Sequence, residues 1–396
     1  MRYPFSPEIF DAMPEALADR YRQLEITLLE EICSRLKISG KLNEVTVQDI
    51  RALRSHGIPL KDIEAAIQKN TGISKKDLTA LFQDVIDRNQ KYYTSVIDMA
   101  QLTAPETLVD AAEVLAIAKQ TEDAMRNITR SMGFLVDAGR TMLPPAKAYQ
   151  WALDSAEMQI KSGAISYSQA IKNAVKQLAD SGLKTVDYES GHVDQIDVAV
   201  RRAVMTGVSQ VCDQYTEQSK EYLDTPYVEV SAHSGARDKA SPHPWSSHKA
   251  WQGKVYYQSK NGESDPLGKY PDLVKTTGYG QVDGLCGANC RHKRYPFIPG
   301  VMERTYTDKQ LADIDPKPFE YEGKKYTHYE ATQKQREIER TVRKLKREKA
   351  AFDAAKLSDD ARAVGARIRV LQAKYKDFSA AANLRTQPER MKVYQK

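Results

Sequence analysis

Hydrophobic residues between positions 15 and 223 recur every three or four places, which is the period of amphipathic helices packed against a core. The first stretch would bury one stripe, formed by Leu17, Tyr21, Leu24, Leu28, Ile32 and Leu36. The same period continues to Leu143 and resumes after Pro145, a residue type well suited to the first position of a helix. The pattern predicts a mainly α-helical N-terminal region over residues 1–223.

The pattern changes at Thr225, where the string TPYVEVSAH alternates β-branched and polar residues as a strand does. As far as Pro299 the chain is rich in Gly, Pro, Ser, His, Trp and Tyr, and short extended strings such as GKVYYQS alternate with turns. This stretch predicts a small α+β domain rich in His, Trp and Gly over residues 224–304. Residues 305–331 are typical of a linker.

Helical periodicity returns at Thr332 and continues almost to the end of the chain. Two stripes follow one another, first Ile338, Val342, Leu345 and Phe352, then Val364, Ile368, Leu371, Tyr375 and Phe378. Two helices joined near Leu357 and Ser358 would pair as a helical hairpin or as coiled-coil seams. Residues 332–396 are therefore predicted to form C-terminal helices.

Positive charge is concentrated on the first of these helices, so we call residues 332–396 the basic tail. The chain of 396 residues has a net charge of +6. The segment from Lys334 to Lys349 carries eight basic and three acidic residues, a net charge of +5, so the rest of the chain carries +1. One-sided positive charge favours contact with nucleic-acid phosphates or with an acidic protein surface. The alternative is a solvated helix face supported by pairs such as Glu339 with Arg343. The candidate contact residues are Arg336, Arg340, Arg343, Lys344 and Arg347.

Composition excludes several classes of protein. Hydrophobic residues make up 41% and charged residues 28%, a balance typical of folded domains rather than of disordered chains. No run approaches the ~18 consecutive apolar residues of a transmembrane helix. The N-terminus has Pro and acidic residues where a signal peptide needs an apolar run. We therefore expect a soluble compartment and no membrane partner.

Histidine, tryptophan and cysteine gather in the predicted α+β domain. Four of the seven histidines and two of the three tryptophans lie between positions 233 and 292, together with a pair of cysteines. Cys and His are the preferred ligands of structural zinc. Three ligands would be Cys286, Cys290 and His292, with His233, His243 or His248 as the fourth. Three residues separate the cysteines where the common zinc knuckle has two, so the alternative is a domain whose rings pack and hydrogen-bond without metal.

The same histidines allow a hydrolytic interpretation. With Arg237, Asp238 and Lys254 they could supply a general acid and base for phosphodiester cleavage, since His titrates near neutrality. The chain has no His-Glu-x-x-His string, no phosphate-cradling Gly loop and no Gly-x-Ser-x-Gly elbow. We therefore favour a docking protein without catalytic residues. A nuclease or toxin-like phosphodiesterase domain at 224–304 is the alternative.

Several strings of the chain resemble the phage minor capsid protein 2 family, and they occur in the family's order. They are RYPFSPEIF, DYESGHVDQIDVAVRRAVMTGVSQ, AHSGARDKASPHPWSSHKAWQGKVYY, GYGQVDGLCGANCRHKRYPFIPG and YKDFSAAANLRTQPER. The motif residues within them are Gly235, Arg237, His243, His248, Trp251, Gly253, Asn289, Cys290 and Arg291. The family is similar to Mu F-like head morphogenesis proteins, whose Asn-Cys-Arg-Cys-type motif corresponds here to residues 289–292, with His292 in place of the last cysteine.

The resemblance implies a structural protein in the head of a tailed bacteriophage. Proteins of this kind are expected inside the capsid near the portal, in few copies, where they act in head assembly and in packaging or ejecting DNA. The implied partners are the portal and other capsid or scaffold proteins. The positive charge of the basic tail adds double-stranded DNA as an expected partner. The implied location is the virion, and the host cytoplasm during assembly. The resemblance implies no catalytic residue, and zinc is the one cofactor that the residues suggest.

Overall fold

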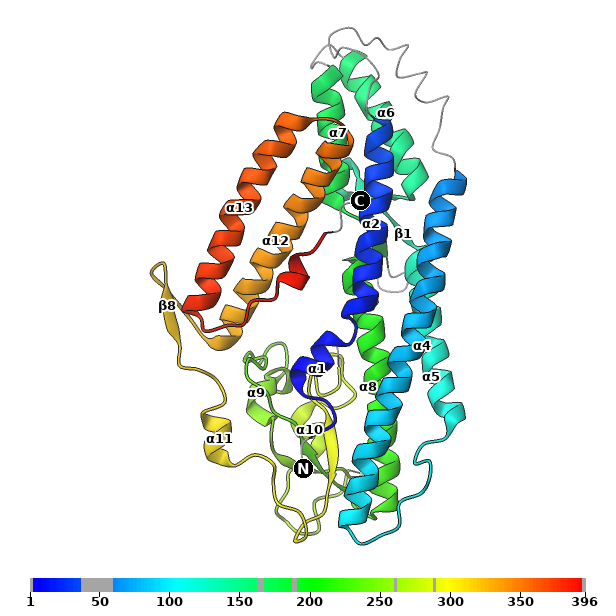
Figure 1. Cartoon of the computed structure of the whole chain (residues 1–396). Coiled ribbons are helices and arrows are strands. Elements are labelled where there is room, and N and C mark those ends of the chain that lie inside the picture. Colours follow the sequence, from blue (N-terminus) through cyan, green and yellow to red (C-terminus); the bar gives the residue numbers. More distant parts are fainter. Residues whose placement is uncertain are drawn as a thin grey trace. The chain divides into compact units, whose positions relative to one another are not determined.

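The computed structural model describes residues 3–36, 60–161, 167–186, 191–259, 262–287 and 290–393. The chain is 61% helical and its sheets are small and antiparallel, so the prediction of a mainly α-helical protein is confirmed (Figure 1). Among the described residues, no helix combines the length and the apolar character needed to cross a membrane. The motif residue Asn289 lies outside the described ranges.

The chain folds into two compact units, each of which combines segments that are far apart in the sequence. Unit 1 contains residues 1–15, 76–123 and 201–333, and unit 2 contains residues 16–75, 124–200 and 334–396. The predicted N-terminal region therefore divides between the units. The predicted α+β domain and linker belong to unit 1, and nearly all of the basic tail belongs to unit 2.

Four helical segments before the predicted α+β domain belong to unit 1. They are α1 (Pro7–Ala12), the C-terminal part of α4 (Leu60–Met99), the first part of α5 (Ala111–Arg130) and most of α8 (Ile196–Tyr222). Helix α8 buries Val204, Val208 and Val211, whose spacing of three or four residues places them on one face. A hydrogen bond of 2.8 Å between Tyr93 and Thr216 joins α4 to α8.

A three-stranded antiparallel sheet forms the centre of the predicted α+β domain. Strand β5 (Tyr227–Val230) lies between β6 (Val255–Tyr257) and β7 (Arg294–Phe297). Val228 pairs with Tyr256 on one side and with Pro296 on the other. The strands predicted from TPYVEVSAH and GKVYYQS are confirmed. One core cluster on this sheet consists of Val228, Val230, Trp251, Tyr256, Leu273, Leu285 and Cys290.

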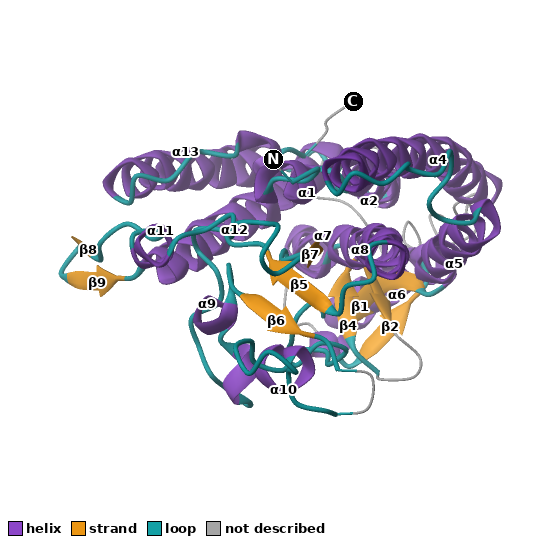
Figure 2. Ribbon diagram, turned by 90° about the horizontal axis from the view of Figure 1, so that it is seen from below, coloured by secondary structure: helices purple, strands orange, loops and turns teal. Residues whose placement is uncertain are grey.

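Short helices lie beside this sheet. They are η2 (Pro244–Ser246), α9 (His248–Trp251) and α10 (Leu273–Thr277). Figure 2 shows α9 and α10 next to β6. The segment predicted as a linker contains α11 (Asp308–Ala312) and a hairpin of β8 (Phe319–Tyr321) and β9 (Lys324–Tyr326). Asp315 in this segment accepts hydrogen bonds from Ser234 and from the backbone of Gly235, so the segment is an integral part of unit 1.

Unit 2 contains a four-stranded antiparallel sheet in the order β2-β1-β3-β4. Its strands are β1 (Met132–Val136), β2 (Thr141–Leu143), β3 (Lys184–Val186) and β4 (Val193–Gln195), with η1 (Asp137–Gly139) between the first two. The helical prediction is wrong for residues 132–143, because a short apolar run fits a buried strand as well as a helix. A side chain at Gly133 would place Cβ 2.5 Å from the carbonyl oxygen of Leu143, so glycine permits the close approach of β1 and β2.

The helices of unit 2 pack around that sheet and around one another. They are α2 (Glu15–Arg35), α6 (Pro145–Lys161), α7 (Tyr167–Ser181), most of α12 (His328–Ala354), α13 (Ser358–Ala381) and η3 (Pro388–Met391). Pro145 is the first residue of α6, as predicted. Helices α12 and α13 form the predicted helical hairpin (Figure 1). Their antiparallel pairing is fixed by hydrogen bonds of Gln335 with Ser379 and of Glu339 with Tyr375.

Candidate functional site

Three segments of unit 1 meet at one end of its sheet. Val230 of β5 pairs with Arg294 of β7, and the backbone of Ser231 donates to the carbonyl of Lys293 at 2.8 Å. The residues that follow β5 therefore run beside the residues that precede β7, which places His233 next to His292. Helix α9 starts at His248 and supplies the third segment.

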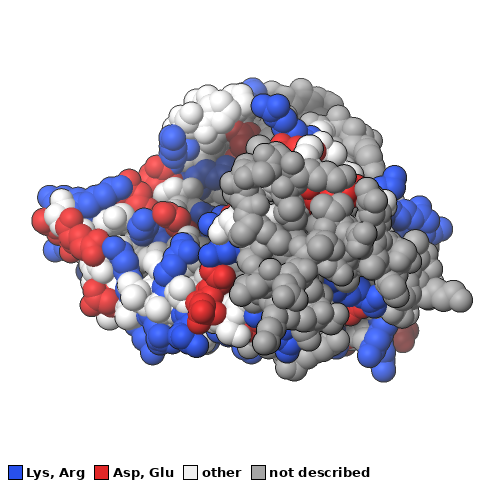
Figure 3. All heavy atoms as spheres, turned by 90° about the horizontal axis from the view of Figure 1, so that it is seen from above, with Lys and Arg blue, Asp and Glu red and all other residues white. Residues whose placement is uncertain are grey.

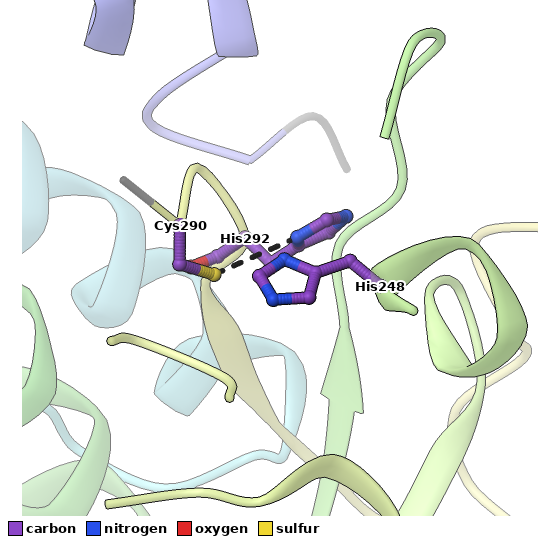
Figure 4. Close-up of side chains that lie close together, drawn as sticks. All are labelled: His248, Cys290 and His292. Carbon is purple, nitrogen blue, oxygen red and sulfur yellow. Dashed lines mark hydrogen bonds between the residues drawn. The ribbon is translucent and has the colours of Figure 1, made fainter. Parts of the chain in front are cut away.

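These segments bring together His248, Cys290 and His292 (Figure 4). All three side chains are buried, and one potential ligand atom from each lies within 4.8 Å of those from the other two. The sulfur of Cys290 lies 3.6 Å from Nδ1 of His292. We call these three residues the His/Cys cluster.

Aromatic rings surround the His/Cys cluster. The ring of His233 stacks on that of His292 with a centroid distance of 4.4 Å and an interplanar angle of 24°. Trp251 meets His292 edge to face at 4.9 Å, and its ring centroid lies 4.6 Å from that of His248. Trp251 is almost fully buried and donates its indole N–H to the carbonyl of Trp245 at 2.8 Å. The rings therefore form a buried wall around the three potential ligands.

Gln252 determines which nitrogen of His292 carries the proton. Its side-chain oxygen lies 3.0 Å from the backbone nitrogen of His233 and 3.0 Å from Nε2 of His292. The backbone nitrogen can only donate, so the atom that faces it is an acceptor. Nε2 of His292 must then be the N–H donor, and Nδ1 presents its lone pair to the sulfur of Cys290.

Asp283 determines which nitrogen of His248 carries the proton. Its backbone carbonyl lies 3.0 Å from Nε2 of His248 and can only accept, so Nε2 carries the proton and Nδ1 is free to bind. Arg237 donates to the same carbonyl at 3.3 Å. The two histidines of the His/Cys cluster thus share one tautomer.

The carboxylate of Asp283 holds the loop that leads into α9. It accepts hydrogen bonds from Trp245 at 3.1 Å, from the Ser246 hydroxyl and from His243 Nδ1 at 3.0 Å. The Ser246 hydroxyl, followed by His243, holds the pKa of the Asp283 carboxyl well below its usual range. Asp283 therefore acts as an anion that organises residues 243–248.

Burial determines the protonation of the His/Cys cluster. It lowers the pKa of His248 to about 4, and together with the neighbouring His233 it lowers the pKa of His292 far below its usual value. Burial also raises the pKa of the Cys290 thiol. At neutral pH both imidazoles are uncharged, and the thiol proton is positioned to bond to Nδ1 of His292.

The remaining zinc candidates have other surroundings. His243 is half exposed at the side chain, where it stacks on Trp245 at 4.6 Å. The sulfur of Cys286 lies 3.8 Å from a carboxylate oxygen of Asp213 and 3.9 Å from the carbonyl of His292. Within the described residues, the potential ligands that come together are thus those of His248, Cys290 and His292, with His233 stacked beside them.

Two motif glycines allow the segment after residue 304 to pack closely. Gly235 has φ +71°, and its backbone N–H donates to Asp315 at 2.7 Å. Gly253 has φ +69°, and a Cβ there would lie 2.3 Å from a methyl carbon of Leu311. Both positions favour glycine by backbone conformation, and Gly253 also by space.

Gln252 and Asp283 were not among the predicted site residues, although both lie inside the strings that carry the family resemblance. The same holds for Arg294, whose side chain is fully buried between Asp213 and Glu217. A single polar residue that forms buried hydrogen bonds leaves no periodic pattern in the sequence. The position of Gln252, Asp283 and Arg294 within these strings is the signal that could have identified them.

The residues of the hydrolytic interpretation bind elsewhere. Asp238 forms a partly exposed ion pair with Lys249 at 3.2 Å. Lys254 donates to the carbonyl of Ala250 at 2.8 Å. Arg237 donates to the Asp283 carbonyl that also accepts from Nε2 of His248.

The basic residues of α12 divide into internal and exposed ones. Arg343 pairs with Asp197, and Arg347 lies 3.6 Å from Glu25, all four side chains being largely buried within unit 2. Lys344 is half exposed and pairs with Asp180 at 3.2 Å. Much of the +5 found in this stretch is therefore balanced by acids from distant parts of the sequence. Arg336 is half-buried, and Arg340 is exposed.

Asp197 lies between two guanidinium groups of unit 2. Arg22 approaches it at 3.2 Å from α2, and Arg343 approaches it from α12. Burial raises the pKa of this carboxyl, but Arg343 and Arg22 outweigh burial and leave the pKa below its usual value. On the left of the face seen in Figure 3, Lys and Arg are interspersed with Asp and Glu.

Comparison with known proteins agrees with the motifs. The sequence model of the family described as phage minor capsid protein 2 matches residues 5–380, a range that includes parts of both units. The match defines a structural protein of the bacteriophage head. The chain belongs to the phage minor capsid protein 2 family, and the predicted resemblance is confirmed.

A curated relative supports this assignment. A protein described as "structural protein" from Lactococcus phage LL-H is 24% identical over 344 residues, which cover 84% of this chain and 86% of the relative. No solved structure matches the chain.

Proposed function

We propose that this capsid protein acts inside the phage head near the portal. There it docks to the portal and to other capsid or scaffold proteins, and it assists head assembly and the packaging or ejection of DNA. The observation that carries the proposal is the family match over residues 5–380, because it includes segments of both compact units rather than one domain.

Localisation in purified particles tests this proposal. Quantitative mass spectrometry should find the chain in DNA-filled heads at a low and constant copy number relative to the portal. External protease should leave it intact until the heads are opened. Cross-linking in intact heads should join it to the portal. Absence from mature heads, digestion in closed heads or cross-links confined to the outer shell would contradict an internal position.

For contact with DNA we propose the exposed side of α12. Arg340 is exposed, and Lys344 is half exposed, whereas Arg343 and Arg347 pair with buried acids of unit 2. Arg336 lies one turn before Arg340 and completes the surface. Binding through such a surface should be independent of sequence and should weaken as salt rises, because it releases counterions from the DNA.

The matched experiment changes charge while keeping the buried pairs of Arg343 and Arg347, and it breaks the half-exposed pair of Lys344 with Asp180. Arg340→Glu with Lys344→Glu should weaken duplex binding and reduce its salt dependence. The control is Arg362→Glu with Arg369→Glu, which makes the same charge change at exposed positions of α13. Equal weakening by both pairs, or by neither, would show that the surface of α12 is not the DNA contact.

We propose further that residues 224–304 act without catalysis. In support, Asp238 and Lys254 bind Lys249 and a backbone carbonyl instead of a histidine. A plasmid-nicking assay with and without divalent metal separates the alternatives. Nicking that is lost in both His233→Ala and His248→Ala would establish the nuclease function, and its absence in every metal would support the docking protein.

A further inference from the structure

We propose that His248, Cys290 and His292 together bind one divalent metal ion of the zinc class. The ion would connect the start of α9 to the segment that enters β7, and so it would close the 41-residue loop between His248 and Cys290. Its role would be to fix the shape of this domain in the capsid protein. This site is independent of the position of the protein in the phage head.

The separations suit a tetrahedral ion. With Zn–S at about 2.3 Å and Zn–N at about 2.0–2.1 Å, tetrahedral geometry places a sulfur about 3.6 Å from a ligating nitrogen. The sulfur of Cys290 lies 3.6 Å from Nδ1 of His292. All three ligand atoms lie within 4.8 Å of one another, so side-chain movements of roughly 1 Å would complete the set.

The proton positions are those of metal-binding histidines. A histidine that ligates a metal usually donates its other ring N–H to a carbonyl or carboxylate, which fixes the tautomer and the ring orientation. His248 donates Nε2–H to the carbonyl of Asp283, and His292 donates Nε2–H to the side-chain oxygen of Gln252. Each ring therefore has its Nδ1 lone pair available. In Figure 4 the two rings and the thiol are turned toward one another.

The neighbouring side chains define the number of protein ligands. His233 lies parallel to the face of the His292 ring, whereas a metal bound by His292 lies in the plane of that ring, so His233 packs against the ligand instead of adding one. The sulfur of Cys286 faces Asp213. Three protein donors leave one position of a tetrahedral ion for water. When the ion binds, the Cys290 thiol releases its proton to solvent and the thiolate takes the metal.

Cobalt(II) titration of the full-length metal-free protein tests the proposal. Co²⁺ substitutes for Zn²⁺ and shows a thiolate charge-transfer band in the near ultraviolet together with strong visible bands in tetrahedral sites. We expect saturation at one Co²⁺ per chain and displacement by one Zn²⁺. Cys290→Ser should abolish the charge-transfer band, and Cys286→Ser, four residues away, should keep it.

Two further variants test the geometry. His248→Gln should weaken Co²⁺ binding by at least ~10-fold, and Gln252→Leu should weaken it by roughly 10-fold through the lost support of His292. Circular dichroism of each metal-free variant establishes that it is folded. If Cys290→Ser unfolds, the weaker Co²⁺ binding of folded His248→Gln serves as the test.

Three results would overturn the proposal. The first is a folded wild-type chain that binds no Co²⁺ or Zn²⁺ at micromolar concentration. The second is a charge-transfer band that persists in Cys290→Ser. The third is a band lost in Cys286→Ser while Cys290→Ser retains it, which would move the site to the other cysteine.

Discussion

The side-chain oxygen of Gln252 accepts a hydrogen bond from Nε2 of His292 at 3.0 Å, deep in unit 1. Gln252 is 3% exposed and also satisfies the backbone N–H of His233. One buried oxygen thus binds two segments, one after β5 and one before β7. The integrity of this end of the sheet depends on that atom.

Gln252→Ala should therefore destabilise the protein. Two buried donors lose their acceptor, at about 1–3 kcal/mol each, which predicts a loss of about 2–6 kcal/mol in the free energy of unfolding. Urea unfolding followed by circular dichroism measures this loss. Gln281→Ala, at an exposed glutamine of the same domain, should change stability by less than ~0.5 kcal/mol. Equal midpoints for the two variants would rule out the structural role of Gln252.

A comparison of two neighbouring glycines distinguishes the effect of steric crowding on stability from the effect of a left-handed backbone. Gly278 ends α10 with φ +61°, and a Cβ there would lie 2.3 Å from the indole of Trp245. Gly280 has φ +87°, and nothing lies within 4 Å of its Cβ position. Both alanine variants incur the left-handed backbone penalty of about 1–2 kcal/mol. Gly278→Ala must also displace Trp245 from Asp283, so it should cost about 1–3 kcal/mol more.

Thermal and urea unfolding of Gly278→Ala and Gly280→Ala give the comparison directly. The intrinsic fluorescence of the folded proteins offers a second readout, because displacement of Trp245 changes the surroundings of an indole in one variant and not in the other. If the two variants were equally stable with identical spectra, close packing at Gly278 would be disproved.

Acid should weaken unit 1 through Glu217. Burial alone would raise the pKa of this carboxyl, but Arg294 and then Lys220 outweigh burial and bring it to about 2. The folded-state pKa lies below the unfolded one, near 4.3. The contribution to stability is therefore complete above that unfolded value and is lost as the pH falls toward 2, when a protonated Glu217 no longer balances the buried Arg294.

Glu217→Gln should flatten this part of the pH profile. The free energy of unfolding, measured in urea between pH 5 and pH 2, should fall less steeply than in the wild type. Glu263→Gln, at an exposed carboxylate of the same domain, is the control and should keep the wild-type slope. A Glu217→Gln profile parallel to that of the wild type would refute the assignment.

Arginines three residues apart on α12 should behave differently. Arg343→Ala removes one of the two guanidinium groups that balance buried Asp197, and we expect a loss of about 2–4 kcal/mol in stability. Arg340→Ala changes an exposed side chain and should stay within about 0.5 kcal/mol of the wild type. Urea unfolding of the two variants measures the difference. If Arg340→Ala lost more stability than Arg343→Ala, the ion pair of Arg343 with Asp197 would not be the stabilising contact of this helix.

The sequence predicted elements with long and regular periods well. The α12–α13 hairpin follows from its two stripes, and β5 and β6 follow from short β-branched strings. The strand Met132–Val136 was missed because five apolar residues do not distinguish a buried strand from a buried helix. Its pairing with Thr141–Leu143 depends on Gly133, which lies close to Leu143. That contact forms only in the tertiary structure, so it gives no local sequence signal.

The sequence predicted which residue types form the candidate site, but it did not predict which individual residues come together there. The gathering of His and Cys between positions 233 and 292 indicated a cluster. Sequence spacing favoured Cys286, whereas the fold brings His248 from α9 to Cys290 and His292. The charge of α12 was visible, but its partners Glu25, Asp180 and Asp197 lie about 150 or more residues away in the sequence.

The division of the chain has a consequence for how the protein is made. All five points at which the chain passes from one compact unit to the other lie inside helices, namely α2, α4, α5, α8 and α12. No stretch of consecutive residues contains either unit alone. During translation, α2 leaves the ribosome more than 300 residues before the last helices of its own unit. The last residue of unit 1 is 333, whereas unit 2 also needs residues 334–396. Unit 2 therefore cannot be completed before all of unit 1 has been synthesised, and a premature stop codon before α12 would leave unit 2 unfinished.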